Sequence, residues 1–234
     1  AEKAGVPIVS PTATNPLVTQ GKKYIFRVCF IDPFQGEMAA KYAYETLGKR
    51  KAALIIDKAQ DYCVGLADFF EKSFTKLGGQ IVAKTYCQTG DKDFTAQLSA
   101  IKAKNPDVLY MPNYYTEVAL AMKQAKDLGL NLPVLSGDGA QDKALIDIGK
   151  QNVEGLMLTG HFEREAASTP LAKKFIPLYE KKYGKVGTFD VMGADAYFVL
   201  ADAIERAKST DGAKIRAALA STKNFKGISG VINI

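Results

Sequence analysis

Ala53-Leu54-Ile55-Ile56-Asp57 is a continuous apolar run that ends on an acid. Runs of this kind are typical of strands that are buried on both faces of a parallel sheet. Residues 35–47 carry apolar side chains at helical spacing before Gly48, and residues 64–77 precede Gly78-Gly79. Glycine directly after the last periodic residue is a common helix end. The sequence therefore predicts a buried strand with a helix on each side.

The same alternation continues after this first unit. It predicts further strands at 81–86, 108–111, 134–135 and 155–159, with helices at 93–104, 116–128 and 143–149. Five strands in series that are separated by helices indicate a doubly wound α/β sheet with right-handed crossovers.

The two ends of the chain follow a different pattern. Residues 1–5 resemble the end of a helix, and residues 6–10 and 24–30 are β-rich runs that predict two strands. After Phe162 the sequence predicts three helices and then one apolar strand, at 170–183, 190–208, 211–220 and 230–234. We expect that last strand to have no partner, and we expect the chain to be truncated at both ends.

Composition excludes several classes of function. The formal charge of +6 comes from lysines interleaved with acids, a pattern that argues against nucleic-acid binding. No apolar stretch reaches the length of a membrane-spanning helix. Cys29, Cys63 and Cys87 lack the close spacing of zinc or dithiol sites, and His161 is the single histidine, which we interpret as structural. We expect neither a metal nor a cofactor.

Candidate ligand-binding residues follow the predicted strands, because open α/β sheets bind ligands at the carboxyl ends of their strands. Thr12 and Thr14 offer hydroxyls for a carboxylate, Asp138 offers a partner for an ammonium, and Tyr62 and Tyr114 can cover apolar and polar edges. This set suits a zwitterion with an apolar tail. Helix caps, a Gly-Asp-Gly turn and packing tyrosines would explain the same residues, so that alternative stays open here.

Several motifs carry a resemblance to a known family. They are Ala1-Glu2-Lys3-Ala4-Gly5-Val6-Pro7, Ser10-Pro11-Thr12-Ala13-Thr14-Asn15-Pro16, Gln35-Gly36, Tyr62 with Gly65-Leu66-Ala67, Gly90-Asp91-Lys92-Asp93-Phe94, Tyr114-Tyr115-Thr116-Glu117 and Ser136-Gly137-Asp138-Gly139. Together they resemble the type I periplasmic binding proteins of branched-chain amino-acid ABC transporters, typified by the leucine/isoleucine/valine-binding protein.

The resemblance implies two doubly wound lobes joined by a hinge. Residues 1–31 would form part of the first lobe, residues 32–162 the second lobe, and residues 163–234 a return to the first. Residues 27–31 and 161–163 would lie at crossings between the lobes. The first lobe would be incomplete, because a serine-bearing loop that helps to bind the carboxylate, and the closing C-terminal segment, would lie outside this sequence.

The resemblance also implies a ligand site with seven residues: Thr12, Ala13, Thr14, Tyr62, Tyr114, Asp138 and Phe189. Thr12 and Ala13 would offer backbone groups, and Thr14 would bind the α-carboxylate of the ligand. Tyr62 and Tyr114 would close over it from the second lobe. Asp138 would receive the α-ammonium, and Phe189 would border the side-chain pocket.

The implied function is capture of a small amino acid, Leu-, Ile- or Val-like, by hinge closure for delivery to an ABC permease. The protein would be periplasmic or extracytoplasmic, monomeric at full length and not an enzyme. Two departures bear on the ligand: Asp138 is one methylene shorter than the glutamate of well-known members, and Thr12 is bulkier than their alanine. A smaller or more polar amino acid therefore stays open.

Two alternatives belong to other classes of function. An α/β hydrolase with Cys63 as nucleophile would need a base, and His161 follows a different strand without an acid-histidine pattern. A ligand-sensing domain of a receptor or regulator would have the same fold, and only sequence outside residues 1–234 would separate it from a transporter component.

Overall fold

The computed structural model describes residues 1–234, which divide into two compact units. Residues 32–160 form one unit, and residues 1–31 together with 161–234 form the other. We call them the sheet unit and the helical unit. The chain passes from one to the other between Ile31 and Asp32 and returns between Gly160 and His161.

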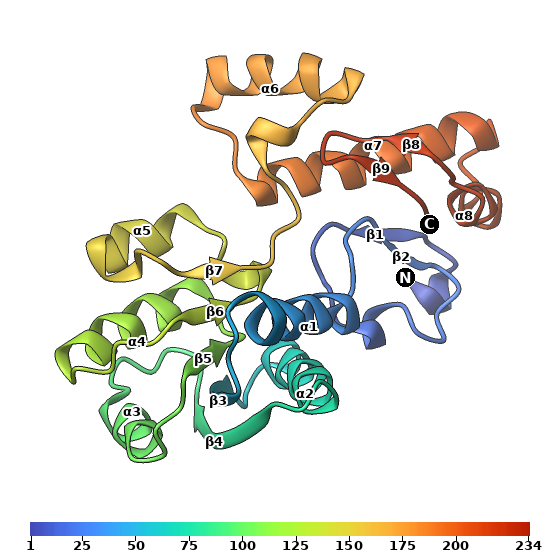
Figure 1. The fold of residues 1–234 in the computed structure, drawn as a ribbon. Helices are drawn as coiled ribbons and strands as arrows, with labels where there is room; N and C mark the ends of the chain where they lie inside the picture. The colour runs from blue at the N-terminus through green and yellow to red at the C-terminus, as the bar shows by residue number, and fades with distance from the viewer. The chain divides into compact units, whose positions relative to one another are not determined.

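The sheet unit contains five parallel strands in the order β4-β3-β5-β6-β7. They are β3 (Lys51–Asp57), β4 (Gln80–Cys87), β5 (Val108–Met111), β6 (Val134–Ser136) and β7 (Met157–Leu158). A helix or a helical pair separates each strand from the next along the chain (Figure 1). The predicted doubly wound α/β sheet is confirmed.

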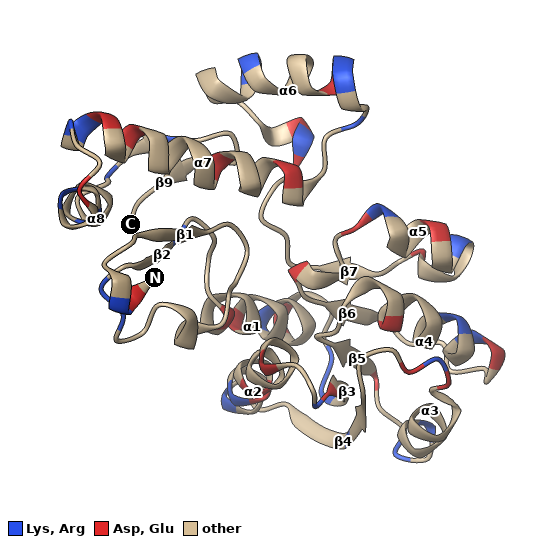
Figure 2. Cartoon of the chain, turned by 180° about the vertical axis from the view of Figure 1, so that it is seen from behind, with Lys and Arg blue, Asp and Glu red and all other residues tan.

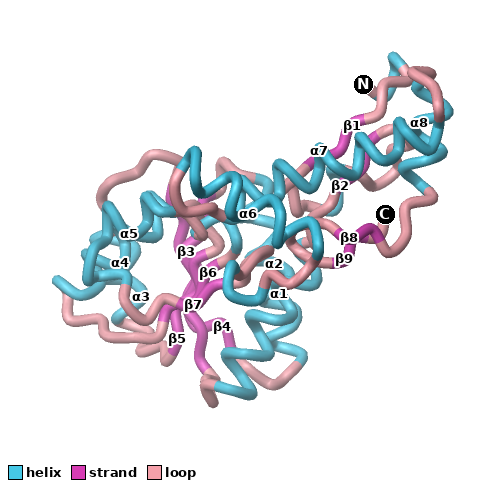
Figure 3. Tube along the Cα trace, turned by 90° about the horizontal axis from the view of Figure 1, so that it is seen from above, coloured by secondary structure: helices cyan, strands magenta, loops and turns pink.

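Helices cover both faces of this sheet. On one face lie α1 (Asp32–Lys41), extended by a π-helical turn (Tyr42–Thr46), and α2 (Asp61–Lys76). On the other lie α3 (Thr95–Lys102), α4 (Tyr115–Asp127) and α5 (Lys143–Gly149), followed by a short 3₁₀ helix (Lys150–Val153). Figure 3 shows the strands between these two groups of helices. Because side chains alternate along a strand, Leu54 packs toward α1 and α2 whereas Ile55 packs toward α3 and α4.

Close packing on the first face positions α1. A Cβ atom on Gly36 would lie 2.7 Å from the Cβ of Phe69 on α2, so only glycine permits this approach of the two helices. Beneath them Phe70 stacks on Tyr110 with ring centroids 4.0 Å apart, and on Phe74 at 5.3 Å. The residue before Gly36, Gln35, is thereby held at the sheet edge and is fully buried.

The helical unit contains three long helices and two small sheets. The helices are α6 (Pro170–Tyr183), α7 (Thr188–Ala207) and α8 (Gly212–Ala220). The parallel pair is β1 (Ile8–Ser10) and β2 (Ile25–Arg27), and the antiparallel pair is β8 (Phe225–Lys226) and β9 (Val231–Ile232). Short 3₁₀ helices lie at Glu2–Ala4, Pro16–Val18 and Arg164–Ala166.

One prediction for this unit is wrong. The strand expected at 230–234 was expected to have no partner, but Val231–Ile232 pairs with Phe225–Lys226. A strand of two residues is too short to show an alternation of apolar and polar side chains, so β8 left no signal in the sequence.

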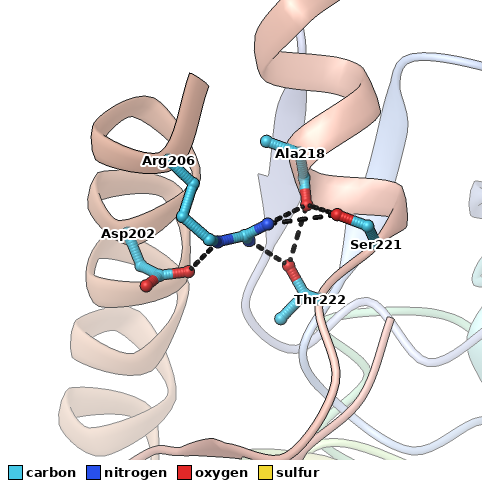
Figure 4. A network of polar contacts seen from close by, with 5 residues as sticks. All are labelled: Asp202, Arg206, Ala218, Ser221 and Thr222. Atoms are coloured by element: carbon cyan, nitrogen blue, oxygen red, sulfur yellow. Dashed lines mark hydrogen bonds and ion pairs between the residues drawn. The ribbon is translucent and has the colours of Figure 1, made fainter. Parts of the chain in front are cut away.

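Polar side chains join the helices and loops of the helical unit. The Arg206 guanidinium on α7 donates to Asp202 Oδ2 at 2.8 Å, to the Ala218 carbonyl at 2.8 Å and to Thr222 Oγ1 at 2.8 Å (Figure 4). Asp195, also on α7 and fully buried, accepts the backbone N–H groups of Ile228 at 2.5 Å and Ser229 at 2.9 Å. These contacts fix α8 and the 227–229 loop to α7.

The surface charges and the helix lengths bear on the classes of function considered above. Basic and acidic residues lie on the same helices in each unit (Figure 2), as the interleaved sequence predicts. None of the helices combines the length and the apolar character that crossing a bilayer requires.

Candidate functional site

Asp138 lies just after the carboxyl end of β6, at the start of a short 3₁₀ helix (Asp138–Ala140). The residue is 3% exposed. Its Oδ1 accepts hydrogen bonds from the Tyr62 hydroxyl and from Gln35 Nε2, both at 2.9 Å. Two neutral donors therefore hold this carboxylate in one orientation.

Tyr62 comes from the first turn of α2 and has two hydrogen bonds through its hydroxyl. It donates to Asp138 and accepts the Gly139 N–H at 3.1 Å. Burial, and then the nearby Asp138 charge, hold the pKa of Tyr62 well above its ordinary value. The hydroxyl therefore stays protonated at neutral pH and remains a donor to the carboxylate.

The two glycines around Asp138 leave room for the tyrosine rings. A Cβ atom on Gly137 would lie 2.4 Å from the Tyr62 hydroxyl oxygen. On Gly139 it would lie 3.0 Å from Tyr62 Cε1 and 3.1 Å from Tyr114 Cδ1. Gly137-Asp138-Gly139 is thus required by close packing against aromatic side chains, whereas a turn would demand glycine for its backbone angles.

Tyr114 directly precedes α4 and is 38% exposed. Its ring lies beside that of Tyr62, with centroids 5.4 Å apart and planes inclined by 38°. Burial raises the pKa of Tyr114, so its phenol is neutral as well. The structure therefore brings Tyr62, Tyr114 and Asp138 together from three different strand ends: a neutral aromatic pair beside a buried acid.

Asp32 and Gln35 belong to the same cluster, and the sequence did not single them out as site residues. Gln35 Nε2 donates to Asp32 Oδ1 at 3.0 Å as well as to Asp138, and both Asp32 and Gln35 are fully buried. The available signal was the Asp-Pro-x-Gln pattern at 32–35, which reads as an ordinary helix start.

The predicted carboxylate-binding residues form one loop of the helical unit, directly after β1. Thr14 is 2% exposed, and its hydroxyl oxygen is buried without a hydrogen-bond partner. Arg27 on β2 fixes this loop, since its guanidinium donates to the Ala13 carbonyl at 2.7 Å and to the Asn15 carbonyl at 2.9 Å. Thr12 is half-buried and Ala13 is exposed. A polar ligand atom would satisfy the Thr14 hydroxyl.

Phe189 lies on the first turn of α7, where the Asp190 carboxylate accepts the Gly187 N–H at 2.9 Å. Its side chain is 38% exposed. Thr12, Ala13, Thr14 and Phe189 belong to the helical unit, whereas Tyr62, Tyr114 and Asp138 belong to the sheet unit.

Cys63 does not have the environment of a nucleophile. The residue is fully buried, and burial, followed by the Asp57 charge, raises the pKa of its thiol. Burial also raises the pKa of Cys87 to about 12. A reactive cysteine needs a thiolate and an accessible site. His161, the single histidine, lies in the helical unit, and its ring centroid is 3.8 Å from that of Phe30.

Comparison with known protein families identifies the family to which this chain belongs. The sequence model described as "periplasmic binding protein" matches residues 1–234. The chain belongs to the periplasmic binding protein family. This is a family of solute-binding proteins and not of enzymes, and the resemblance carried by the sequence motifs is confirmed.

Individual members of the periplasmic binding protein family show the same likeness. Leu/Ile/Val-binding protein homolog 3 of Brucella melitensis biotype 1 is 34% identical over 230 residues, which are 97% of this chain and 62% of that protein. The leucine-binding protein LivK of Thermotoga maritima is 51% identical with a TM-score of 0.97, over 100% of this chain and 67% of LivK.

A third relative is known with a ligand in place. LivJ of Streptococcus pneumoniae, solved in complex with isoleucine, is 32% identical with a TM-score of 0.90, over 98% of this chain and 65% of LivJ. The chain therefore has the fold of type I periplasmic binding proteins and spans about two thirds of the length of these relatives.

Proposed function

We propose that this chain belongs to a periplasmic or extracytoplasmic protein that captures a small amino acid and delivers it to an ABC permease. The observation that carries the proposal is the buried Asp138 carboxylate, oriented by Tyr62 and Gln35 beside the Tyr62–Tyr114 pair. The names of the relatives support the ligand class, since they are Leu/Ile/Val-binding, leucine-binding and isoleucine-bound proteins.

Each pole of the amino acid has a matching group. The α-ammonium is paired with Asp138, which supplies the negative charge that a buried cation requires. The α-carboxylate is held by the Thr14 hydroxyl, which is buried without a partner, and by backbone groups of Thr12 and Ala13. Phe189 and the two tyrosines enclose the aliphatic side chain.

The proposed mechanism is hinge closure. The ligand contacts residues of both units, so its binding energy favours a closed arrangement over an open one. The chain crossings at Ile31–Asp32 and Gly160–His161 are the hinge segments of this proposal. Delivery then requires a permease that recognises the closed form.

Replacing Asp138 tests the proposal. In calorimetric titrations with L-leucine, Asp138→Ala is expected to lose about 2 to 5 kcal/mol of binding free energy, because the ammonium would be buried without a counter-charge. Asp147→Ala is the matched control, since Asp147 is an exposed acid of the same unit. Leucine affinity unchanged by Asp138→Ala would remove the proposed role of this carboxylate.

A thermal-shift screen of the twenty amino acids identifies the ligand, because a ligand that binds only the folded state raises the melting temperature. We expect the largest shifts from leucine, isoleucine and valine. A larger shift from a smaller or more polar amino acid would mean that the shorter acid at Asp138 and the bulkier side chain at Thr12 have changed the specificity. The absence of any shift would count against amino-acid capture by residues 1–234.

A further inference from the structure

The Gln35 side-chain amide has four hydrogen-bond partners inside the sheet unit. Its Nε2 donates to Asp32 Oδ1 at 3.0 Å and to Asp138 Oδ1 at 2.9 Å. Its Oε1 accepts the Asp138 backbone N–H at 3.2 Å and the Thr159 hydroxyl at 2.5 Å. An amide group has two donor hydrogens and two acceptor positions, so the capacity of this side chain is fully used.

These four partners determine which way the amide points. The nitrogen faces two carboxylate oxygens, which can only accept, and the oxygen faces a backbone N–H, which can only donate. A flipped amide would place its oxygen against both carboxylates and its nitrogen against a donor. Because Gln35 is fully buried, water cannot compensate for such a mismatch.

The amide also lies between two buried acids. Asp32 and Asp138 share one nitrogen as donor, and the charges of both, after burial, raise the pKa of Tyr110 beneath them. A glutamine donates to both carboxylates at once without adding charge. Methionine would donate to neither of them, and glutamate would add a third carboxylate.

Two of the four partners lie next to the points where the chain enters and leaves this unit. Asp32 is the first residue after the crossing at Ile31, and Thr159 is the second to last before the crossing at His161. The Gln35 side chain thus bonds to the Asp138 carboxylate, which is the proposed partner of the ligand ammonium. It also bonds to a residue at the start of the unit and to one near its end.

We infer that Gln35 is a positioning residue for ligand capture, which holds the Asp138 carboxylate in register with both chain crossings. The inference rests on the proposed function, in which Asp138 pairs with the ligand ammonium. Gln35 acts through Asp138, and through Asp32 and Thr159 it ties that carboxylate to the segments that move on closure.

The first test compares Gln35→Met and Gln35→Glu with a matched control, by calorimetric titration with L-leucine. Both Gln35 variants are expected to bind at least about tenfold more weakly than wild type, which corresponds to losing one strong hydrogen bond to a charged group. The control is Gln124→Met: Gln124 lies on α4 of the same unit, and its amide bonds to the backbone of Lys92 and Phe94. Its affinity is expected to stay within about twofold of wild type.

Unfolding curves of the same variants without ligand separate positioning from general stability. A merely structural Gln35 would lower the melting temperature and leave the leucine affinity of the folded protein unchanged, which would overturn the inference. Thr159→Val gives a milder change: it removes one partner of the amide and is expected to weaken binding about threefold. Unchanged affinity in Thr159→Val would overturn the link to the second crossing.

A readout without ligand makes failure of the inference distinguishable from failure of the proposed function. The side-chain ¹⁵N–¹H signals of Gln35, assigned by their loss in Gln35→Met, are expected to shift in Asp138→Asn and to remain in place in Asp147→Asn. If wild type binds none of the twenty amino acids, amino-acid capture is wrong, and these signals still test whether Gln35 positions Asp138. If the chemical shifts of these signals do not change in Asp138→Asn, the positioning role is overturned, even in a protein that binds leucine.

Discussion

The two units of this protein are stabilised in different ways. The sheet unit is one continuous stretch of chain whose five-stranded sheet lies between two groups of helices, with β3, β5 and β6 almost entirely buried. The helical unit joins two stretches that are far apart in sequence, and its sheets have two strands each. Within residues 161–234, the buried Asp195 carboxylate and the more exposed Arg206 guanidinium connect segments that lie 12 to 34 residues apart. Because its sheets are smaller, we expect the helical unit to depend more on such polar contacts for its stability than the sheet unit does.

The same difference applies to the candidate site. In the sheet unit the Asp138 carboxylate is held by side chains that lie 76 and 103 residues away in sequence. In the helical unit the Thr12–Thr14 loop is held by a hydrogen bond from the Arg27 guanidinium to the Ala13 carbonyl, and these two residues are only 14 apart in sequence. Residues distant in sequence therefore fix the acid of the sheet unit, whereas a residue nearby in sequence fixes the loop of the helical unit.

The largest expected effect comes from removing an aromatic ring in the sheet unit. Phe70→Ala is expected to lower the free energy of unfolding by about 3 to 5 kcal/mol, because a fully buried ring that stacks on Tyr110 would leave a cavity. Chemical denaturation measures the loss, and hydrogen exchange is expected to accelerate in β3 and β5. Ile146→Ala, at a side chain that is 63% exposed, is the control and should change little.

The second largest expected effect comes from removing the buried acceptor Asp195 in the helical unit. Asp195→Ala removes the acceptor for the Ile228 and Ser229 N–H groups and is expected to cost about 1 to 3 kcal/mol, because buried donors lose their partner. Hydrogen exchange should accelerate in the 227–229 loop and not in β3. Asp195→Asn keeps one acceptor oxygen and should lose less. An Asp195→Ala effect spread equally over both units would contradict the contrast between them.

Much of the fold could be predicted because periodicity is a local property. The five strands and the helices between them follow from apolar runs and from glycines at helix ends, such as Gly48. The pairing of β8 with β9 could not be predicted, since two residues carry no period. The predicted strand at 24–30 also shortened to Ile25–Arg27, which shows that apolar composition alone does not set strand bounds.

The candidate site was only partly predictable. Tyr62, Tyr114 and Asp138 could be placed together because the carboxyl ends of parallel strands share one edge. Gln35 could not be singled out, because its bond to Asp138 spans 103 residues and its local pattern is that of a helix start. The contact of Thr14 with a ligand stays a prediction, as does the role of Phe189.

The rates of cysteine alkylation provide a kinetic comparison of the two units. None of the three cysteines forms a disulfide, and Cys29 is 9% exposed in the helical unit whereas Cys63 and Cys87 are fully or almost fully buried in the sheet unit. We expect iodoacetamide at pH 8 to label Cys29 first. The buried thiols of the sheet unit should react only on unfolding, because their raised pKa values keep them protonated. Peptide mass spectrometry measures the order, and early labelling of Cys63 would reopen the possibility of a reactive thiol.

The smallest expected effect concerns an ion pair in the helical unit. Arg164 donates from Nε and from Nη2 to the two carboxylate oxygens of Glu180, both at 2.7 Å. These hydrogen bonds, with a further one from the Val186 N–H, lower the pKa of Glu180 from its ordinary value of 4.5 to about 2. A depressed pKa in the folded state means that the unfolded chain binds more protons in this range. The pair therefore stabilises the fold above about pH 5, and its contribution is lost as the pH falls toward 2.

Arg164→Met tests this pair. Its melting temperature should lie slightly below that of wild type by a constant difference above about pH 5, and the two curves should converge as the pH falls toward 2. A ¹³C NMR titration should show the Glu180 pKa returning toward its ordinary range in the variant. Because the pair is partly exposed to solvent, the difference should also shrink in high salt. A difference that persisted at low pH would mean that Arg164 acts through packing of its side chain, and the helical unit would then depend less on polar contacts than the buried contacts of Asp195 indicate.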